Sequence, residues 1–143
     1  IRSSTINSKI NLLKHAEDIH ILGDENKIAQ VFDNLIQNAA SFSKENNFIN
    51  IRIEKNLQSV TVTVEDNGPG FSKGSLKKVF DRFYTDRPKN EKFGNHSGLG
   101  LSISKQIVEA HSGSIEALNR LNQKNECLGG SVKVTFPQEK IKF

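Results

Sequence analysis

The stretch that most constrains the fold is an alternating segment that ends in a carboxylate and a run of glycines. Residues 60–65 read Val-Thr-Val-Thr-Val-Glu, which is the period of a strand with one buried face. Continued alternation places Asp66 on the same face as the valines. A carboxylate there is costly unless a donor binds it. The sequence therefore predicts an inward-facing Asp66 at the end of a half-buried strand.

Residues 66–70 read Asp-Asn-Gly-Pro-Gly, and this run has two interpretations. Asn-Gly and Pro-Gly are common turn dipeptides, so a plain reverse turn is the first. The second is a binding loop, because glycine allows the backbone to bend sharply and to approach a ligand closely. Taken alone, so short a motif favours the turn. Motifs elsewhere in the chain are needed to choose between the reverse turn and the binding loop.

Composition limits the classes of protein that the chain can belong to. With 143 residues, 35% hydrophobic and 25% charged, it is expected to form a single domain, residues 1–143, with its own core. It contains no long apolar run and no signal peptide, so we expect no membrane-inserted segment. It begins with Ile1, which indicates a fragment or a processed chain. The single cysteine, Cys127, excludes an internal disulfide and fits a reducing compartment.

The net charge of +4 is compatible with a phosphate-bearing ligand. The basic residues are scattered among Asp and Glu and form no block. Nucleic-acid binders usually concentrate Lys and Arg on one face. We therefore expect no nucleic-acid partner.

A helix is predicted after Asp24, which suits its N-cap. Its buried stripe recurs at helical spacing: Ile28, Val31, Phe32, Leu35, Ile36 and Ala39. Beside it runs a stripe of amides, Gln30, Asn34 and Asn38, each one turn beyond the last. A solvated face is the simpler interpretation. Asn is a mediocre helix former, however, so two in register favour a polar role such as an oxygen ligand for a hard cation.

The remaining patterns predict a sheet with helices on one face. Strands are expected at residues 9–12, 18–22, 48–55, 60–65, 114–117 and 131–136, with a hairpin joining 48–55 to 60–65 and a polar loop over 119–129. Several strands keep one polar face, which indicates a one-sided sheet. Ser75 is expected to cap a short helix with Leu76, Val79, Phe80 and Phe83 on one face. The predicted class is an α+β two-layer sandwich with a mixed, mostly antiparallel sheet.

Residues 85–97 are polar and lack any period, which is typical of a functional loop or lid. Residues 98–101, Gly-Leu-Gly-Leu, then open a helix that His111 and Gly113 close. A helix start with glycines suits phosphate oxygens. The third glycine of the dinucleotide fingerprint is missing, since Ile103 stands there, and the polar sheet face argues against a Rossmann sheet. We expect a nucleotide pocket in which Asp66 binds the base and the helix start binds phosphates.

Several short motifs in this order resemble those of one family. They are the asparagine box at residues 34–39, the first glycine box at 66–70, the phenylalanine box at 80–84, the second glycine box at 97–101 and a glycine pair at 129–130. Together they resemble the catalytic ATP-binding domain of bacterial sensor histidine kinases, in the superfamily shared with gyrase, Hsp90 and MutL. The resemblance runs from about residue 10 to 137 and implies a Bergerat-type ATP-binding fold. Residues 83–88 and 94–97 resemble the ChvG-type subgroup.

The resemblance implies a role for each matching residue. Asp66 would accept a hydrogen bond from the adenine amine, and Asn38 would ligate Mg²⁺ with Asn34 as a supporting catalytic residue. Arg82 or Arg87 would stabilise charge on the transferred phosphoryl group, and the two remain open. Where many relatives carry a lysine this chain has Ser41, so a lid cation is expected to replace it. The implied ATP-binding residues are Asn38, Asp66, Gly68, Gly70, Gly98, Leu99, Gly100 and Leu101.

The resemblance also implies a function and partners. The domain would bind ATP with Mg²⁺ and supply the γ-phosphoryl group to a histidine on a separate dimerisation and phospho-acceptor domain. None of His15, His20, His96 and His111 has the acceptor's sequence context, so autophosphorylation of this fragment alone is not expected. The implied partners are that acceptor domain, in a full-length homodimer, and a response regulator. The implied location is the cytoplasmic side of the inner membrane, with the full-length protein anchored there.

Other functions share parts of the pattern. ATP-hydrolysing clamps and chaperones of the superfamily place a general-base Glu where Asn34 stands here. A serine kinase acting against a sigma factor would share the pocket, but the phenylalanine box favours a histidine kinase. A degenerate nucleotide-binding module, or pseudokinase, is the remaining alternative, prompted by Ser41.

Overall fold

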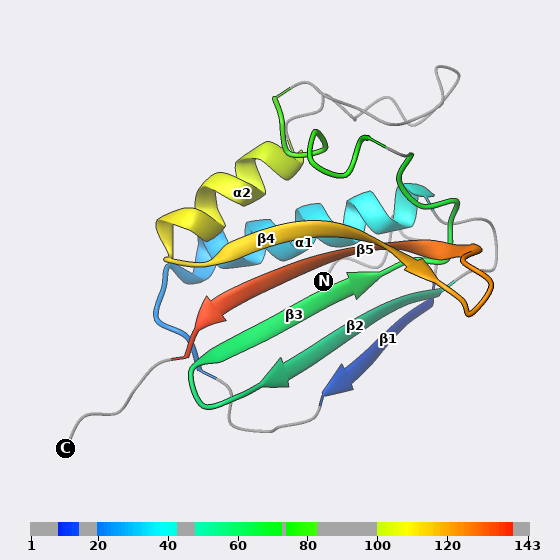
Figure 1. Ribbon diagram of the computed structural model, residues 1–143. Coiled ribbons are helices and arrows are strands. Elements are labelled where there is room, and N and C mark those ends of the chain that lie inside the picture. Colours follow the sequence, from blue (N-terminus) through cyan, green and yellow to red (C-terminus); the bar gives the residue numbers. More distant parts are fainter. Residues whose placement is uncertain (1–8, 15–19, 43–47, 73, 83–99, 139–143) are drawn as a thin grey trace.

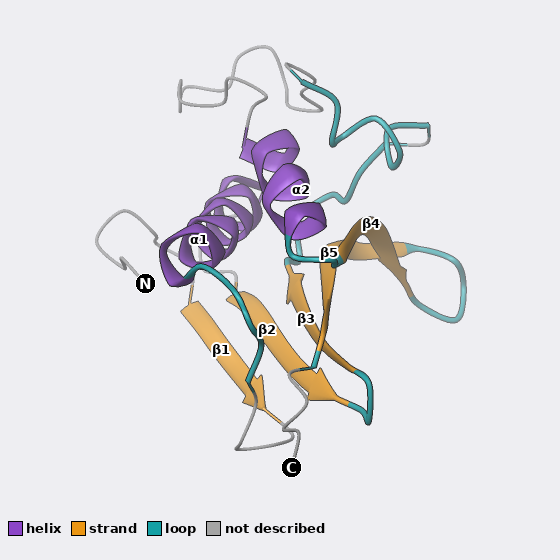
Figure 2. Cartoon of the chain, turned by 90° about the vertical axis from the view of Figure 1, so that its left-hand side faces the viewer, coloured by secondary structure: helices purple, strands orange, loops and turns teal. Residues whose placement is uncertain are grey.

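The computed structural model describes residues 9–14, 20–42, 48–72, 74–82 and 100–138. They form two layers, a sheet and two helices that cover one of its faces (Figures 1 and 2). The elements in chain order are β1 (Lys9–Lys14), α1 (Glu25–Phe42), β2 (Phe48–Lys55), β3 (Ser59–Glu65), α2 (Gly100–Ala110), β4 (Ser114–Leu121) and β5 (Cys127–Pro137). No helix in these ranges is long and apolar enough to cross a membrane.

The sheet is mixed and mostly antiparallel, as predicted. Its strand order is β1-β2-β3-β5-β4. The edge strand β1 runs parallel to β2, and the other neighbours are antiparallel. Asn56 closes the predicted β2–β3 hairpin, because its Oδ1 accepts hydrogen bonds from the N–H groups of Gln58 and Ser59, both at 2.8 Å. This order places β3 at the centre of the sheet, with its C-terminal end between β2 and β5.

The core lies between α1, α2 and the covered face of the sheet. Along β3 buried residues alternate with half-buried ones, and the valines face inward. The predicted stripe of α1 supplies the opposite wall, with Val31, Leu35, Ile36 and Ala39 buried. Asp24 caps α1, since its Oδ1 accepts from the N–H groups of Asn26 at 3.0 Å and Lys27 at 3.2 Å. The alternation and the helical stripe therefore predicted this interface correctly.

The end of α2 differs from the prediction in its detail. The left-handed residue is Ser112, with φ of 61°, and not Gly113. Gly113 donates its N–H to Val108 O at 2.9 Å, which is a Schellman-type closure. A Cβ at Gly113 would lie 2.5 Å from Thr135 O. Glycine is therefore needed here for close packing against β5 rather than for its backbone dihedral.

Three predicted elements require correction. The predicted strand at 18–22 is irregular over His20–Leu22, and residues 18 and 19 lie outside the described ranges. Ile21 packs against the core, whereas Leu22 is 81% exposed. The predicted helix after Ser75 is a series of turns, with Phe83 outside the described ranges. Since these turns form no helix, Ser75 has no helix to cap, and its buried hydroxyl donates to Ser72 O at 2.8 Å.

The predicted loop at 119–129 is mostly strand. β4 continues to Leu121 and β5 begins at Cys127, with a register shift between Arg120 and Leu121. The turn between them is closed by Asn122, whose Oδ1 accepts from the N–H groups of Lys124 at 2.8 Å and Glu126 at 3.0 Å. Polar composition therefore concealed strand pairing at this end of the hairpin.

Candidate functional site

Asp66 lies at the end of β3 and is buried, with 4% of its surface exposed. Its Oδ1 accepts hydrogen bonds from Gly68 N–H at 2.9 Å and Gly130 N–H at 3.1 Å. Its own N–H donates to Gly130 O at 2.9 Å. Two backbone donors offset much of the cost of burying a carboxylate. The predicted inward orientation is confirmed.

The glycine pair of β5 packs directly against Asp66. A Cβ at Gly129 would lie 1.9 Å from Asp66 O, and the φ of Gly129 is 150°. A Cβ at Gly130 would lie 3.0 Å from the Phe71 ring and 3.3 Å from Asp66 Oδ2. A side chain at Gly129 would clash with the backbone of Asp66, and one at Gly130 would make a tight contact with Phe71 and the carboxylate. The pair thus forms the floor beneath the first glycine box.

Side chains from β4 and β5 hold the loop that follows Asp66. Asn119 Oδ1 accepts from Phe71 N–H at 2.7 Å, and its Nδ2 donates to Phe71 O at 2.8 Å. Arg120 donates to Asp66 O and, at 3.3 Å, to Leu128 O. The Cys127 thiol lies 3.4 Å from Pro69 O. The loop is therefore bound to the hairpin at several points along its length.

Sequence reasoning missed Asn119 and Arg120, because it assigned them to a polar loop. A signal was present in the chain. Ile115 and Ala117 point toward the helices, and alternation places Asn119 on the same face. A polar residue at an inward position is the same signal that identified Asp66.

The amide stripe of α1 contacts the start of α2. Asn34 Nδ2 donates to Gly100 O and to the buried Ser104 Oγ, both at 3.3 Å. Asn38 is half-buried one turn further along, and its carbonyl accepts from the Ser41 hydroxyl at 2.6 Å. A purely solvated face is therefore excluded for Asn34, while the cation role of Asn38 stays a prediction.

The first turn of α2 begins at exposed Gly100. The N–H groups at a helix start lack intrahelical partners and carry a positive partial charge, which suits phosphate. Leu101 is half-buried against the core, and Arg82 is exposed at the end of the turns after Ser75. Several predicted site residues lie outside the described ranges: Gly98 and Leu99, and Arg87 and His96 in the predicted lid. The rest of the lid lies outside them as well.

Residues 23–140 match the family model described as "Histidine kinase-, DNA gyrase B-, and HSP90-like ATPase". The chain belongs to this family. Among curated relatives it is 45% identical over 116 residues to the sensor protein ChvG of Agrobacterium fabrum, covering 80% of this chain and 20% of ChvG. It is 40% identical over 121 residues to the sensor protein kinase WalK of Staphylococcus aureus, covering 82% of this chain and 28% of WalK. The chain thus spans about a fifth to about a quarter of these relatives.

A solved structure shares the fold of this histidine kinase-type ATPase domain. The catalytic domain of histidine kinase ThkA, in a nucleotide-free form, superposes with a TM-score of 0.77 at 30% identity, covering 95% of this chain and 84% of that one. The predicted resemblance, including its ChvG-type subgroup, is therefore confirmed. So is the predicted α+β class of a catalytic ATP-binding domain.

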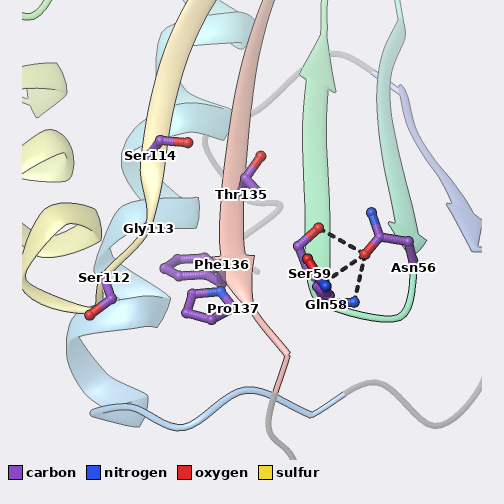
Figure 3. Close-up of a pocket in the computed structure, with 9 residues that line it drawn as sticks. All are labelled: Asn56, Gln58, Ser59, Ser112, Gly113, Ser114, Thr135, Phe136 and Pro137. Carbon is purple, nitrogen blue, oxygen red and sulfur yellow. Dashed lines mark hydrogen bonds between the residues drawn. The ribbon is translucent and has the colours of Figure 1, made fainter.

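An open pocket of about 350 Å³ lies at the opposite end of the sheet from Asp66 (Figure 3). It lies between the β2–β3 turn, the end of α2 and the end of β5, and it contains none of the predicted site residues. Its described lining consists of Asn56, Gln58, Ser59, Ser112, Gly113, Ser114, Thr135, Phe136 and Pro137. None of these side chains is charged, so the pocket does not suit a nucleotide triphosphate.

Asn38, the predicted magnesium ligand, is a half-buried amide on α1. Within the described ranges no three His, Cys, Asp or Glu side chains group as a metal site. Mg²⁺ commonly takes one protein oxygen or two, with phosphate and water completing its shell. An amide oxygen from Asn38 would fit that pattern.

Proposed function

We propose that this ATPase-family domain binds ATP with Mg²⁺ and transfers the γ-phosphoryl group to a histidine on a separate acceptor domain of the same protein. The observation that carries this proposal is the buried Asp66 carboxylate, held by two backbone amides beneath a glycine loop. Asp66 Oδ1 accepts hydrogen bonds from both backbone amides. A carboxylate offers about four lone-pair sites, and the adenine amine would donate to this one. Gly68 and Gly70 allow the loop to approach the base.

At the phosphate end we assign the start of α2 and the amides of α1. Asn34 fixes the first turn of α2 through Gly100 and Ser104. Asn38 would ligate Mg²⁺ that bridges phosphate oxygens. Gly98, Leu99, Gly100 and Leu101 would place backbone N–H groups against the phosphates.

Two arginines are candidates for stabilising the transferred group. Arg82 lies within the phenylalanine box, and Arg87 belongs to the predicted lid. Either could offset charge on the γ-phosphoryl oxygens in the transition state. A cation of the lid would also take over the role of the lysine that many relatives carry at the position of Ser41.

Phosphotransfer fits the site better than hydrolysis. General-base activation of water needs a group that accepts a proton, and the Asn34 amide does not. Its Nδ2 is already engaged with Gly100 and Ser104. This favours a kinase over an ATP-hydrolysing clamp of the same family.

The relatives support a proposal for the larger assembly. ThkA has been solved in complex with a response regulator protein, TrrA, and ChvG and WalK are named as sensor proteins. We propose the same kind of partners here: an acceptor domain in a homodimer and a response regulator. The domain would then work on the cytoplasmic side of the inner membrane, anchored through other parts of the protein.

Calorimetry and phosphotransfer together test the proposal. The wild-type chain should bind a non-hydrolysable ATP analogue at one site, more tightly with Mg²⁺. Asp66→Asn keeps an oxygen for the two backbone amides but replaces the other with an NH₂ group, so affinity should fall at least about tenfold. Asp33→Asn, at an exposed position on α1, is the matched control and should bind like wild type.

Transfer of labelled phosphate to the acceptor domain then separates kinase from alternatives. Rapid ATP hydrolysis without the acceptor would support the clamp function instead. Binding without any transfer would support a pseudokinase. No binding at all would contradict the proposal.

A further inference from the structure

We infer that Asn119 and Arg120 are positioning residues for the nucleotide, because they hold the adenine-binding loop, residues 66–71, in its bound shape. The inference rests on the proposed function and extends it to the β4–β5 hairpin. It assigns to this hairpin end a role in affinity for the adenine part of the ligand.

Asn119 pairs with Phe71 as a strand residue would. Its Oδ1 accepts from Phe71 N–H at 2.7 Å while its Nδ2 donates to Phe71 O at 2.8 Å. Both ends of the amide are engaged, so the orientation of the side chain is fixed. The Phe71 ring is buried and lies 3.0 Å from where a Cβ of Gly130 would stand. Asn119 therefore fixes the far end of the loop against the floor of the site.

Arg120 holds the near end of the same loop. Its guanidinium donates to the carbonyl of Asp66 and to that of Leu128. Neighbouring residues on a strand point to opposite faces, yet the side chains of Asn119 and Arg120 both contact this one loop. The register shift between Arg120 and Leu121 explains this, because such irregularities re-aim side chains. The loop is thus held at both of its ends by consecutive residues.

The loop needs such support because of its own composition. Gly68 and Gly70 give its backbone the freedom to adopt many conformations. Ordering it on binding would cost free energy, and a loop that is already ordered avoids that cost. A Cβ at Gly70 would lie 2.7 Å from Asn119 Oδ1, so the loop follows the hairpin closely. Asn119 and Arg120 would therefore act on affinity through preorganisation.

The test measures affinity for two nucleotides that share adenine but differ in phosphates. Asn119→Ala should raise the Kd of ADP and of a non-hydrolysable ATP analogue by the same factor, about tenfold. Asn119→Asp keeps the acceptor for Phe71 N–H but sets a carboxylate oxygen against Phe71 O in place of the Nδ2 donor, so it should lose affinity as Asn119→Ala does. With the acceptor domain, KM for ATP should rise while kcat stays unchanged. Arg120→Ala should behave as Asn119→Ala does, with Arg120→Lys intermediate.

Asn122→Ala is the matched control on the same hairpin. Asn122 bonds within its own turn, to Lys124 and Glu126, so this variant should keep wild-type affinity. Amide exchange at Gly68 and Phe71 should accelerate in Asn119→Ala and not in the control. Should Asn119→Ala fail to fold, Asn119→Asp and Arg120→Lys decide by the same measurements.

Two results would overturn the inference. The first is wild-type affinity for both nucleotides in the folded Asn119 and Arg120 variants. The second is an equal loss of affinity in Asn122→Ala, which would indicate general destabilisation. Absence of nucleotide binding by the wild-type chain would overturn the proposed function as well, so the two failures are distinguishable.

Discussion

At the scale of single residues, the site depends on backbone groups that approach a buried carboxylate. Asp66 Oδ1 accepts hydrogen bonds from the N–H groups of Gly68 and Gly130. Both donors belong to the backbone, so the position of the carboxylate depends on how closely these two glycines approach it. This dependence makes the glycines beside Asp66 more sensitive to substitution than glycines elsewhere.

Gly129→Ala tests this sensitivity. The new methyl would lie 1.9 Å from Asp66 O on a backbone with φ of 150°. We expect the free energy of unfolding to fall by about 3 kcal/mol or more, because both strain and a clash contribute. Gly74→Ala is the matched control, since its φ is 84° with no atom within 4 Å of the added Cβ. It should cost only about 1 kcal/mol. Urea unfolding of both variants measures the difference, and equal losses would contradict the close-approach argument.

At the scale of elements, α1 connects both ends of α2 to the rest of the molecule. Asn34 binds the first turn of α2. At the other end, His111 Nδ1 donates to Ile107 O at 2.7 Å while its Nε2 accepts from Asp24 N–H at 3.0 Å. One contact lies beside the proposed phosphate site and the other lies far from it. Substitutions at the two ends should therefore have different consequences.

Asn34→Ala should weaken the phosphate end of the site. Without its donors the first turn of α2 is less well held, so affinity for the ATP analogue should fall more than affinity for ADP. Ser104→Ala keeps the bond to Gly100 and should have a smaller effect on the same ratio. Calorimetry with both nucleotides makes the comparison. A uniform loss for the two nucleotides would place Asn34 at the adenine end and contradict the assignment.

His111→Ala should affect stability and leave binding unchanged. The variant leaves Asp24 N–H without its imidazole acceptor and removes an edge-on contact between the ring and Phe136, at 6.5 Å between centroids. A loss of about 1–2 kcal/mol in the free energy of unfolding is expected. Nucleotide affinity of the folded variant should equal that of wild type. A lowered affinity would show that the far end of α2 is coupled to the site.

The same elements show what could be predicted from the sequence. Local periodicity was sufficient for α1, for β3 and for the inward Asp66, because burial of one face repeats along the chain. Periodicity places Asn119 on the inward face, but it could not identify the partners of Asn119 and Arg120, which lie 48 and 54 residues away. Local periodicity also predicted a helix wrongly after Ser75, because apolar spacing cannot distinguish a continuous helix from separate turns. Contacts between distant segments decide those cases.

At the scale of the whole molecule, the two ends of the sheet have different roles. The described residues proposed to bind the nucleotide or its metal ion are Asp66, Gly68 and Gly70 after β3, Gly100 and Leu101 at the start of α2, Asn38 on α1, and Arg82. The opposite end carries the open, uncharged pocket (Figure 3). Function should therefore depend on one end of the sheet, together with the segment that joins the phenylalanine box to α2.

The choice between Arg82 and Arg87 belongs to this scale, because the reaction needs a second domain. Whichever arginine stabilises the γ-phosphoryl transition state should, when changed to Ala, lower the rate of phosphotransfer about 10²-fold or more. The Kd of ADP should stay the same, since ADP lacks that group. The other arginine serves as the matched control, because it has the same charge and lies close by in the sequence. Single-turnover transfer to the acceptor domain, at saturating ATP, measures the rate without the binding step. Unchanged rates in both single variants would assign charge stabilisation to another lid cation or to the metal ion.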